Sequence, residues 1–164
     1  REQIDNLEQE GIECRVIPGV SSFTASAAAI NKEFTLPSVS QTVILTRMEG
    51  RTPVPEEESL VKLASHRASM AIFLSVGNIG EVVEKLTVHY PKETPVAVVC
   101  KATWNDQKVV EGTLETIEEK VKEENIQKTA QILVGDFLGD DYEYSKLYDP
   151  TFTHEYRQGI SEKS

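Results

Sequence analysis

The alternation of apolar and polar positions divides the chain into short strands and helices. Three apolar segments predict strands that are covered on both faces: 69–76, 95–100 and 131–136. Between them, residues 79–86 and 114–121 repeat apolar side chains at helical spacing. Strands that alternate with helices in this way predict an α/β fold.

The first residues extend this pattern. Residues 4–9 predict the end of a helix, and Gly11 is a suitable stop signal. Residues 12–17 then alternate apolar and polar side chains, which predicts a strand. The chain has no initiator Met and begins inside a helical pattern, so we expect it to be a fragment.

A proline–glycine turn leads into an alanine-rich helix. The helix is expected over residues 23–30, with Ser21 or Ser22 as its N-cap. Such a turn can present backbone N–H groups to a ligand. The alternative is an ordinary connection between a strand and a helix, which is common in α/β proteins.

Charged residues follow the β-branched run at 42–46, which predicts a further strand. The loop over residues 47–55 contains Arg47 and Arg51 on either side of Glu49, and a helix is expected from residue 56. Two forked guanidinium donors suit a ligand that carries carboxylates. The alternative is a solvated loop with local Arg–Glu pairs.

Composition narrows the possible partners. The chain has 164 residues, 39% of them hydrophobic, and a net charge of −10, so a nucleic acid or another polyanion is an unfavourable partner. Cys14 and Cys100 lie in strand-like surroundings and are expected to be isolated buried thiols, which favours a cytoplasmic location. His66 and His154 are expected to be structural, and Trp104 either lines a ligand cleft or covers a sheet edge.

Several catalytic motifs have no match in the sequence. There is no phosphate-binding P-loop, no serine nucleophile elbow and no Cys/His zinc pattern. An enzyme with this sequence would therefore act by holding its reactants in place rather than through a nucleophilic side chain.

Taken together, the segments resemble the tetrapyrrole methyltransferases that use S-adenosylmethionine. General family marks are the Ile-Pro-Gly-Val-Ser-Ser turn at 17–22, the strand and loop at 95–103, Gln107 and the Gly-Thr-Leu turn at 112–114. A branch that methylates C11 of precorrin-4 or cobalt-precorrin-4 in cobalamin biosynthesis is similar in segments 45–56, 72–75, 102–104 and 145–150.

The resemblance implies a two-domain α/β fold with the cofactor between the domains. Residues 1–38 would be the end of the N-terminal domain, 39–145 a complete C-terminal mixed-sheet α/β domain, and 146–164 an extended tail. The family's earlier strands, with their glycine-rich loop, have no counterpart here, so we expect the chain alone to be incomplete for catalysis.

Residue by residue, the resemblance also implies a cofactor site. S-adenosylmethionine, and S-adenosylhomocysteine as product, would contact Ser21, Ser22, Leu74, Ala102 and Thr103. Relatives often carry Tyr-Met where this chain has Phe-Leu at 73–74, and Gly-Thr where it has Ala-Thr at 102–103. No side chain is expected to act as a catalyst or a metal ligand.

The tetrapyrrole itself is expected to meet the arginine loop. Arg47 and Arg51 are the candidates for holding its acetate and propionate groups, and the family implies a homodimer. Two other interpretations remain: a non-catalytic module that binds tetrapyrrole or dimerises, and a related methyltransferase that acts on another corrin ring carbon.

Overall fold

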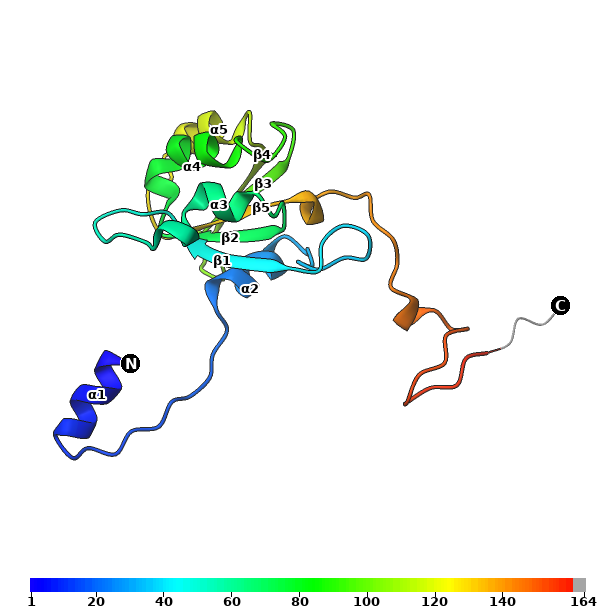
Figure 1. The fold of residues 1–164 in the computed structure, drawn as a ribbon, viewed down its shortest axis with the longest axis horizontal. Helices are drawn as coiled ribbons and strands as arrows, with labels where there is room; N and C mark the ends of the chain where they lie inside the picture. The colour runs from blue at the N-terminus through cyan, green and yellow to red at the C-terminus, as the bar shows by residue number, and fades with distance from the viewer. Residues whose placement is uncertain (161–164) are drawn as a thin grey trace.

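A computed structural model of the chain describes residues 1–160 (Figure 1). Its helices and strands, in chain order, are α1 (Glu2–Gln9), α2 (Ser22–Ala29), β1 (Val43–Arg47), α3 (Leu60–Ala64), β2 (Ser69–Phe73), α4 (Ile79–Leu86), β3 (Pro95–Cys100), β4 (Lys108–Thr113), α5 (Ile117–Glu123) and β5 (Ala130–Val134). Short 3-10 turns lie at Glu56–Glu58, Val76–Asn78, Asp136–Leu138 and Lys146–Tyr148.

The five strands form one mixed sheet in the order β1-β2-β5-β3-β4. β1 and β2 are parallel, whereas β5 is antiparallel to both of its neighbours, and β4 is antiparallel to β3. The carboxyl ends of β1, β2 and β3 therefore share one edge of the sheet with the start of β5. Every loop that leaves a strand at this edge can contribute to the same site.

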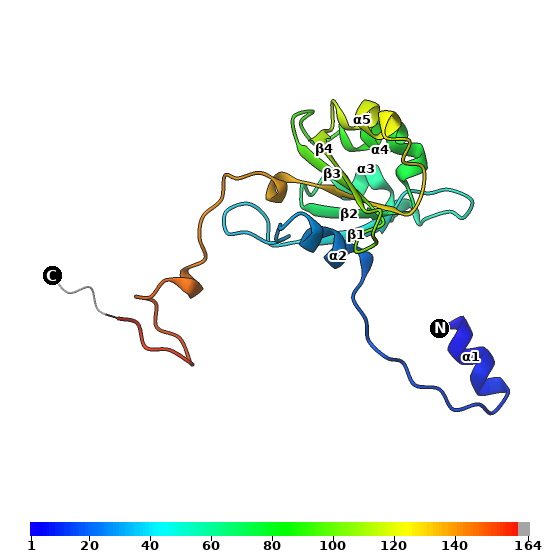
Figure 2. The same cartoon turned by 180° about the vertical axis from the view of Figure 1, so that it is seen from behind.

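Helices cover both faces of the sheet. Figures 1 and 2 show α3, α4 and α5 on one face and α2 on the other. The alternation of side chains along β2 explains the two cores, because Met70 and Ile72 face the larger helical layer whereas Ala71 faces α2. Phe137 and the half-buried Phe23 complete the smaller core beneath α2. The predicted mixed-sheet α/β fold is confirmed.

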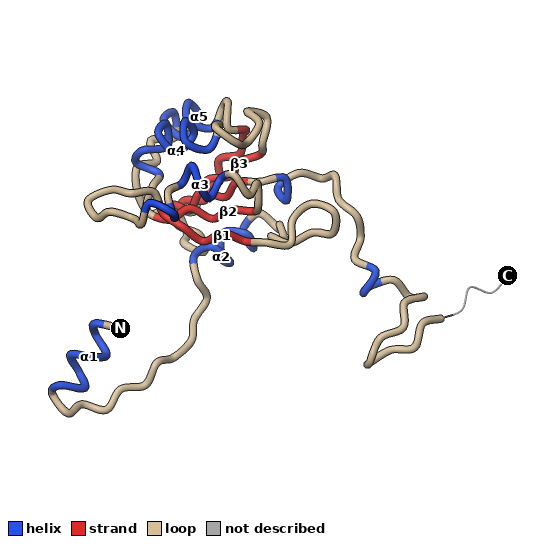
Figure 3. Tube along the Cα trace, in the orientation of Figure 1, coloured by secondary structure: helices blue, strands red, loops and turns tan. Residues whose placement is uncertain are grey.

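The strand expected over residues 12–17 is not formed. This segment is extended without a strand partner among the described residues, and its apolar side chains are exposed, with Ile17 at 79%. An alternating pattern forms a strand only when another strand supplies the hydrogen bonds. Figure 3 shows this segment as a loop between α1 and α2.

Element boundaries differ from expectation at three loops. The strand expected to reach residue 76 ends at Phe73, because Leu74 has a left-handed backbone (φ 55°). The helix expected from residue 56 is a 3-10 turn followed by α3, and the helix expected after Thr113 begins at Ile117. Propensity alone places such ends poorly, since turns and short helices compete there.

The carboxyl-terminal tail runs away from the sheet (Figure 1). One arginine organises it, because the Arg157 guanidinium donates hydrogen bonds to the carbonyl groups of Leu147, Asp149 and Phe152. Residues 161–164 of the expected 146–164 tail lie outside the described residues.

Near the amino-terminal end, α2 packs on the sheet although it precedes the predicted domain boundary between residues 38 and 39. That domain boundary stays a prediction.

Candidate functional site

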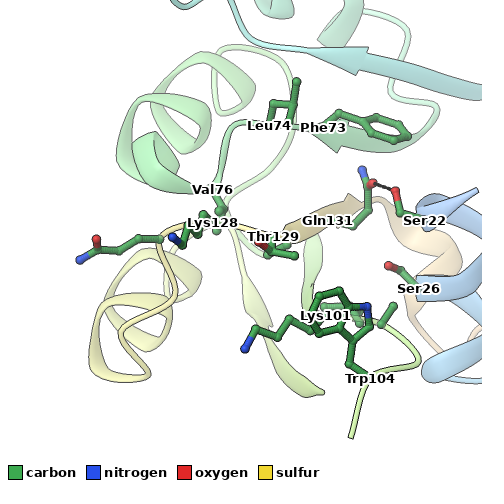
Figure 4. Close-up of a pocket in the computed structure, with 14 residues that line it drawn as sticks. Ser22, Ser26, Phe73, Leu74, Val76, Lys101, Trp104, Lys128, Thr129 and Gln131 are labelled. Atoms are coloured by element: carbon green, nitrogen blue, oxygen red, sulfur yellow. Dashed lines mark hydrogen bonds between the residues drawn. The ribbon is translucent and has the colours of Figure 1, made fainter. Parts of the chain in front are cut away.

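A cavity of about 340 Å³ opens at the shared sheet edge, between α2 and the ends of β2, β3 and β5 (Figure 4). Its volume lies within the range of small-molecule sites. Most of its wall is apolar. The residues that line it are Ser22, Ser26, Phe73, Leu74, Val76, Val99, Lys101, Ala102, Trp104, Gln127, Lys128, Thr129, Ala130 and Gln131.

Strained backbone surrounds this cavity. Leu74, Lys101, Thr103 and Thr129 all have positive φ angles, of 55°, 51°, 72° and 58°. A non-glycine residue in this conformation is unfavourable by on the order of 1 kcal/mol and persists only where its surroundings fix it. Leu74 and Lys101 directly follow β2 and β3, Thr129 directly precedes β5, and Thr103 lies in the loop after β3, so the backbone turns sharply at the mouth of the cavity.

The loop between β3 and β4 is fixed by its own side chains. The Thr103 N–H donates to Gln107 Oε1 at 2.8 Å, and the Lys101 ammonium pairs with Asp106. The hydrogen bond that Lys101 donates to Asp106 raises the pKa of Lys101 and lowers the pKa of Asp106. Lys101 Nζ also lies 5.9 Å from the Trp104 ring centre, and Trp104 is 60% exposed at the cavity. The loop thus holds an indole ring at the rim.

The floor of the cavity is polar and uncharged. Ser22 Oγ on α2 donates to Gln131 Oε1 on β5 at 3.1 Å. Gln131 is 3% exposed and Ser26 is fully buried, yet Gln131 Nε2 and Ser26 Oγ have no hydrogen-bond partner among the described residues. Buried polar atoms are nearly always paired in proteins, so these two atoms identify a place where a ligand group fits.

The arginine loop begins next to this cavity. Arg47 pairs with Phe73 in the parallel register of β1 and β2, and the Met48 N–H donates to Ser75 Oγ at 3.0 Å. The Arg47 guanidinium turns back into its own loop, where it donates to the Thr52 and Pro53 carbonyls at 3.1 and 3.0 Å. Arg51 is exposed and makes no side-chain hydrogen bond within residues 1–160.

A lysine anchors the same loop from the helical side. Lys85 Nζ on α4 lies 2.5 Å from Glu49 Oε1 and 3.1 Å from Glu81 Oε1. The hydrogen bond that Lys85 donates to Glu49 raises the pKa of Lys85. Glu49 therefore pairs with Lys85. The solvated-loop interpretation required Glu49 to pair with its neighbouring arginines instead.

Three of the sequence-predicted cofactor residues lie together. Ser22, Leu74 and Ala102 come from α2, the end of β2 and the loop after β3, and all three line the cavity. Ser21 is the position before α2, and Thr103 is the next residue along from Ala102, but neither lines the cavity. Whether these five residues bind a cofactor stays a prediction.

Sequence reasoning missed Ser26 and Gln131. A glutamine inside an otherwise apolar strand was the available signal, because such a residue needs a polar partner.

Cys14 is exposed, against expectation, whereas Cys100 is buried. No group of three or more potential metal ligands occurs within residues 1–160. None of the described helices is both long and apolar enough to cross a membrane.

Comparison with known proteins places this geometry in context. The sequence profile of the Tetrapyrrole (Corrin/Porphyrin) Methylases matches residues 1–118. The cobalt-precorrin-4 C(11)-methyltransferase of Methanocaldococcus jannaschii is 57% identical over 160 residues, which cover 96% of this chain and 62% of the relative.

Solved structures agree with this match. A cobalt precorrin-4 methyltransferase superimposes with a TM-score of 0.82 at 44% identity, covering 85% of this chain and 59% of that one. A uroporphyrin-III C-methyltransferase from Thermus thermophilus, complexed with S-adenyl homocysteine, shares the fold at a TM-score of 0.66 and 19% identity, covering 84% and 59%. The chain spans less than two thirds of the length of these relatives.

Proposed function

The chain belongs to the tetrapyrrole (corrin/porphyrin) methylase family, and from this premise we propose that it serves S-adenosylmethionine-dependent methylation of C11 in precorrin-4 or cobalt-precorrin-4. The name of the 57%-identical relative supports the substrate and the ring position. One observation carries the proposal for this chain: Ser22, Leu74 and Ala102, from three separate elements, line a single cavity.

The residues of the cavity fit a nucleoside-containing cofactor. Apolar walls at Phe73, Leu74 and Val99 suit a flat base, and the unpaired Gln131 amide nitrogen suits one of its acceptors. Sharp turns at Lys101 and Thr129 bring the backbone close to the cavity mouth. The bound S-adenosylhomocysteine of the T. thermophilus relative supports the same class of ligand.

The chemistry needs few catalytic side chains. The sulfonium methyl of S-adenosylmethionine is an electrophile that an electron-rich ring carbon can attack directly. This chain would then act by alignment: α2 and the three strand ends hold the cofactor, and the Trp104 rim limits the access of water. Alignment of two reactants alone can lower a barrier by ~7–11 kcal/mol.

For the tetrapyrrole, we propose separate roles for the two arginines. Arg51 is exposed and can meet a carboxylate of the macrocycle directly, whereas Arg47 shapes the loop that presents it. Arg51→Ala should weaken substrate binding, and Arg47→Ala should do so through loss of loop order. Unchanged substrate affinity in both variants would remove this loop from the site.

Assembly and location are further proposals. A homodimer is supported by exposed aromatic side chains in the tail, such as Tyr148 at 79% and Tyr156 at 91%. Two cysteines without a disulfide support a cytoplasmic location. Light scattering of the purified chain would give a dimer mass if the first proposal holds, and a monomer mass would contradict it.

The test of the reaction is a product assay with the natural gene product that contains this chain. The enzyme is incubated with precorrin-4, or its cobalt complex, and with methyl-labelled S-adenosylmethionine. The proposal predicts labelled carbon on C11 by NMR. Label on another ring carbon would contradict the position, and the absence of label would contradict the activity.

A further inference from the structure

We infer that Gln131 is a specificity-determining residue that donates a hydrogen bond to the nucleoside part of the cofactor, with Ser26 beside it as a second contact. The inference rests on the proposed function and deepens it. It concerns two side chains in the floor of the cavity, Gln131 and Ser26, neither of which belongs to the cofactor residues expected from the sequence.

Burial without a partner is the first observation. Gln131 is 3% exposed and Ser26 is 0% exposed, but Gln131 Nε2 and Ser26 Oγ lack partners among the described residues. A buried donor that is left unpaired destabilises the fold. A residue such as leucine would fill the same position in the strand without this penalty, so the polar group is explained by a ligand that pairs with it.

Orientation is the second observation. Ser22 Oγ donates to Gln131 Oε1, and in this arrangement the amide nitrogen is the free atom. Figure 4 shows this hydrogen bond, and it shows the Ser26 hydroxyl directed from α2 into the same space. The cavity floor therefore offers an amide donor at Gln131 and a hydroxyl at Ser26 that can donate or accept.

Register places this group on the correct face. Gln131 lies directly opposite Val99 in the antiparallel β3–β5 pair and two residues before Leu133, which belongs to the core beneath α2. Side chains two residues apart in a strand share a face, so Gln131 projects toward α2 and the cavity. A one-residue change in register would instead bury it in the larger core.

The chemistry of the surroundings selects the part of the ligand. Both floor residues are neutral, and of the two lysines that line the cavity, Lys101 is already paired with Asp106 and Lys128 is exposed to solvent. A buried ammonium or carboxylate would lack a counter-charge at the floor. A ring nitrogen or a ribose oxygen is an uncharged acceptor that a glutamine amide satisfies in full.

The experiment measures binding to the wild-type chain and to Gln131→Leu by isothermal titration calorimetry. The two ligands are S-adenosylhomocysteine and 5′-methylthioadenosine, which keeps the nucleoside but lacks the amino acid. We expect Gln131→Leu to lower the binding affinity for both ligands about tenfold or more, as loss of one well-formed hydrogen bond would do. Gln41→Leu, just before β1 and outside the cavity, is the matched control and should bind like the wild type.

Thermal unfolding without ligand separates binding from structure. Because Gln131→Leu removes an unpaired buried donor, its melting temperature should equal or exceed that of the wild type while its affinity falls. If Gln131→Leu does not fold, Gln131→Met gives the same test, since it keeps the length of the side chain without a charge and has no amide nitrogen. Ser26→Ala should show a smaller loss of affinity.

Each result decides between the two claims. If the wild type binds S-adenosylhomocysteine and the variants bind it equally well, the inference is overturned and the proposed function stands. A loss for S-adenosylhomocysteine but not for 5′-methylthioadenosine would overturn the nucleoside assignment. If the wild type binds neither ligand, the proposed cofactor site fails and the inference fails with it.

Discussion

Arg47 shows how one side chain can determine the shape of a loop. Its guanidinium donates to the carbonyls of Met48, Thr52 and Pro53, and thereby closes residues 48–53 into a fixed turn. The spacing of two arginines in the sequence predicts anion binding for both. It could not show that one of them is used internally, because main-chain carbonyls compete with any ligand for the same donors.

Arg47→Ala should open this loop. Loss of these charged hydrogen bonds at a partly exposed site should lower the free energy of unfolding by about 1–2 kcal/mol. Hydrogen exchange by mass spectrometry should show faster exchange over residues 48–54. Arg51→Ala is the control, and equal exchange in the two variants would argue against the role assigned to Arg47.

Leu74 gives a second test at this scale. Its side chain is 89% exposed, so it contributes little to the core, yet its backbone is left-handed. Leu74→Gly relieves that strain while adding unfolded-state entropy, and these effects nearly cancel. We expect a change of less than about 1 kcal/mol in unfolding free energy together with weaker binding of S-adenosylhomocysteine. Unchanged binding would exclude Leu74 from the cofactor site.

At the scale of elements, prediction succeeded where burial was two-sided. The strand at Pro95–Cys100 and the helix at Ile79–Leu86 match their apolar patterns. The strand expected at 12–17 failed because its pattern needs a partner that local sequence does not specify. The N-cap position expected at Ser21 is confirmed, although the Ser21 side chain makes no capping hydrogen bond.

Tyr90 joins two elements and makes stability depend on pH. Its hydroxyl donates to the Ala68 carbonyl at 2.6 Å, and burial, aided by the charge of Asp136, raises the pKa of Tyr90 to about 12. The unfolded value is about 10, so the stabilisation is complete below pH 10 and is lost as pH rises toward 12. The expected loss is roughly 2–3 kcal/mol.

Tyr90→Phe should remove this dependence. Chemical denaturation at several pH values should show a wild-type stability that falls between pH 10 and 12, and a flatter curve for the variant. At pH 8 the variant should be less stable by about 1 kcal/mol because the Ala68 carbonyl loses its donor. Parallel curves for the two proteins would show that Tyr90 does not titrate in this way.

For the whole molecule, the sheet edge unites segments that are far apart in sequence. The cavity gathers residues from α2 and from three strand ends, and the family resemblance predicts three of them from the sequence. Ser26 and Gln131 can be recognised as site residues only from the fold, because the packing of α2 across β5 brings them together. The packing of α2 on the sheet was likewise not evident from the expected domain boundary.

Trp104 offers the most direct test of the central claim, that this cavity binds S-adenosylmethionine or its product. It is the only tryptophan in the chain, and it lies at the cavity with 60% of its surface exposed. Titration with S-adenosylhomocysteine should change its fluorescence to saturation with one ligand per chain and should reduce its quenching by acrylamide. An emission spectrum and a quenching constant that stay unchanged up to millimolar ligand would contradict the account.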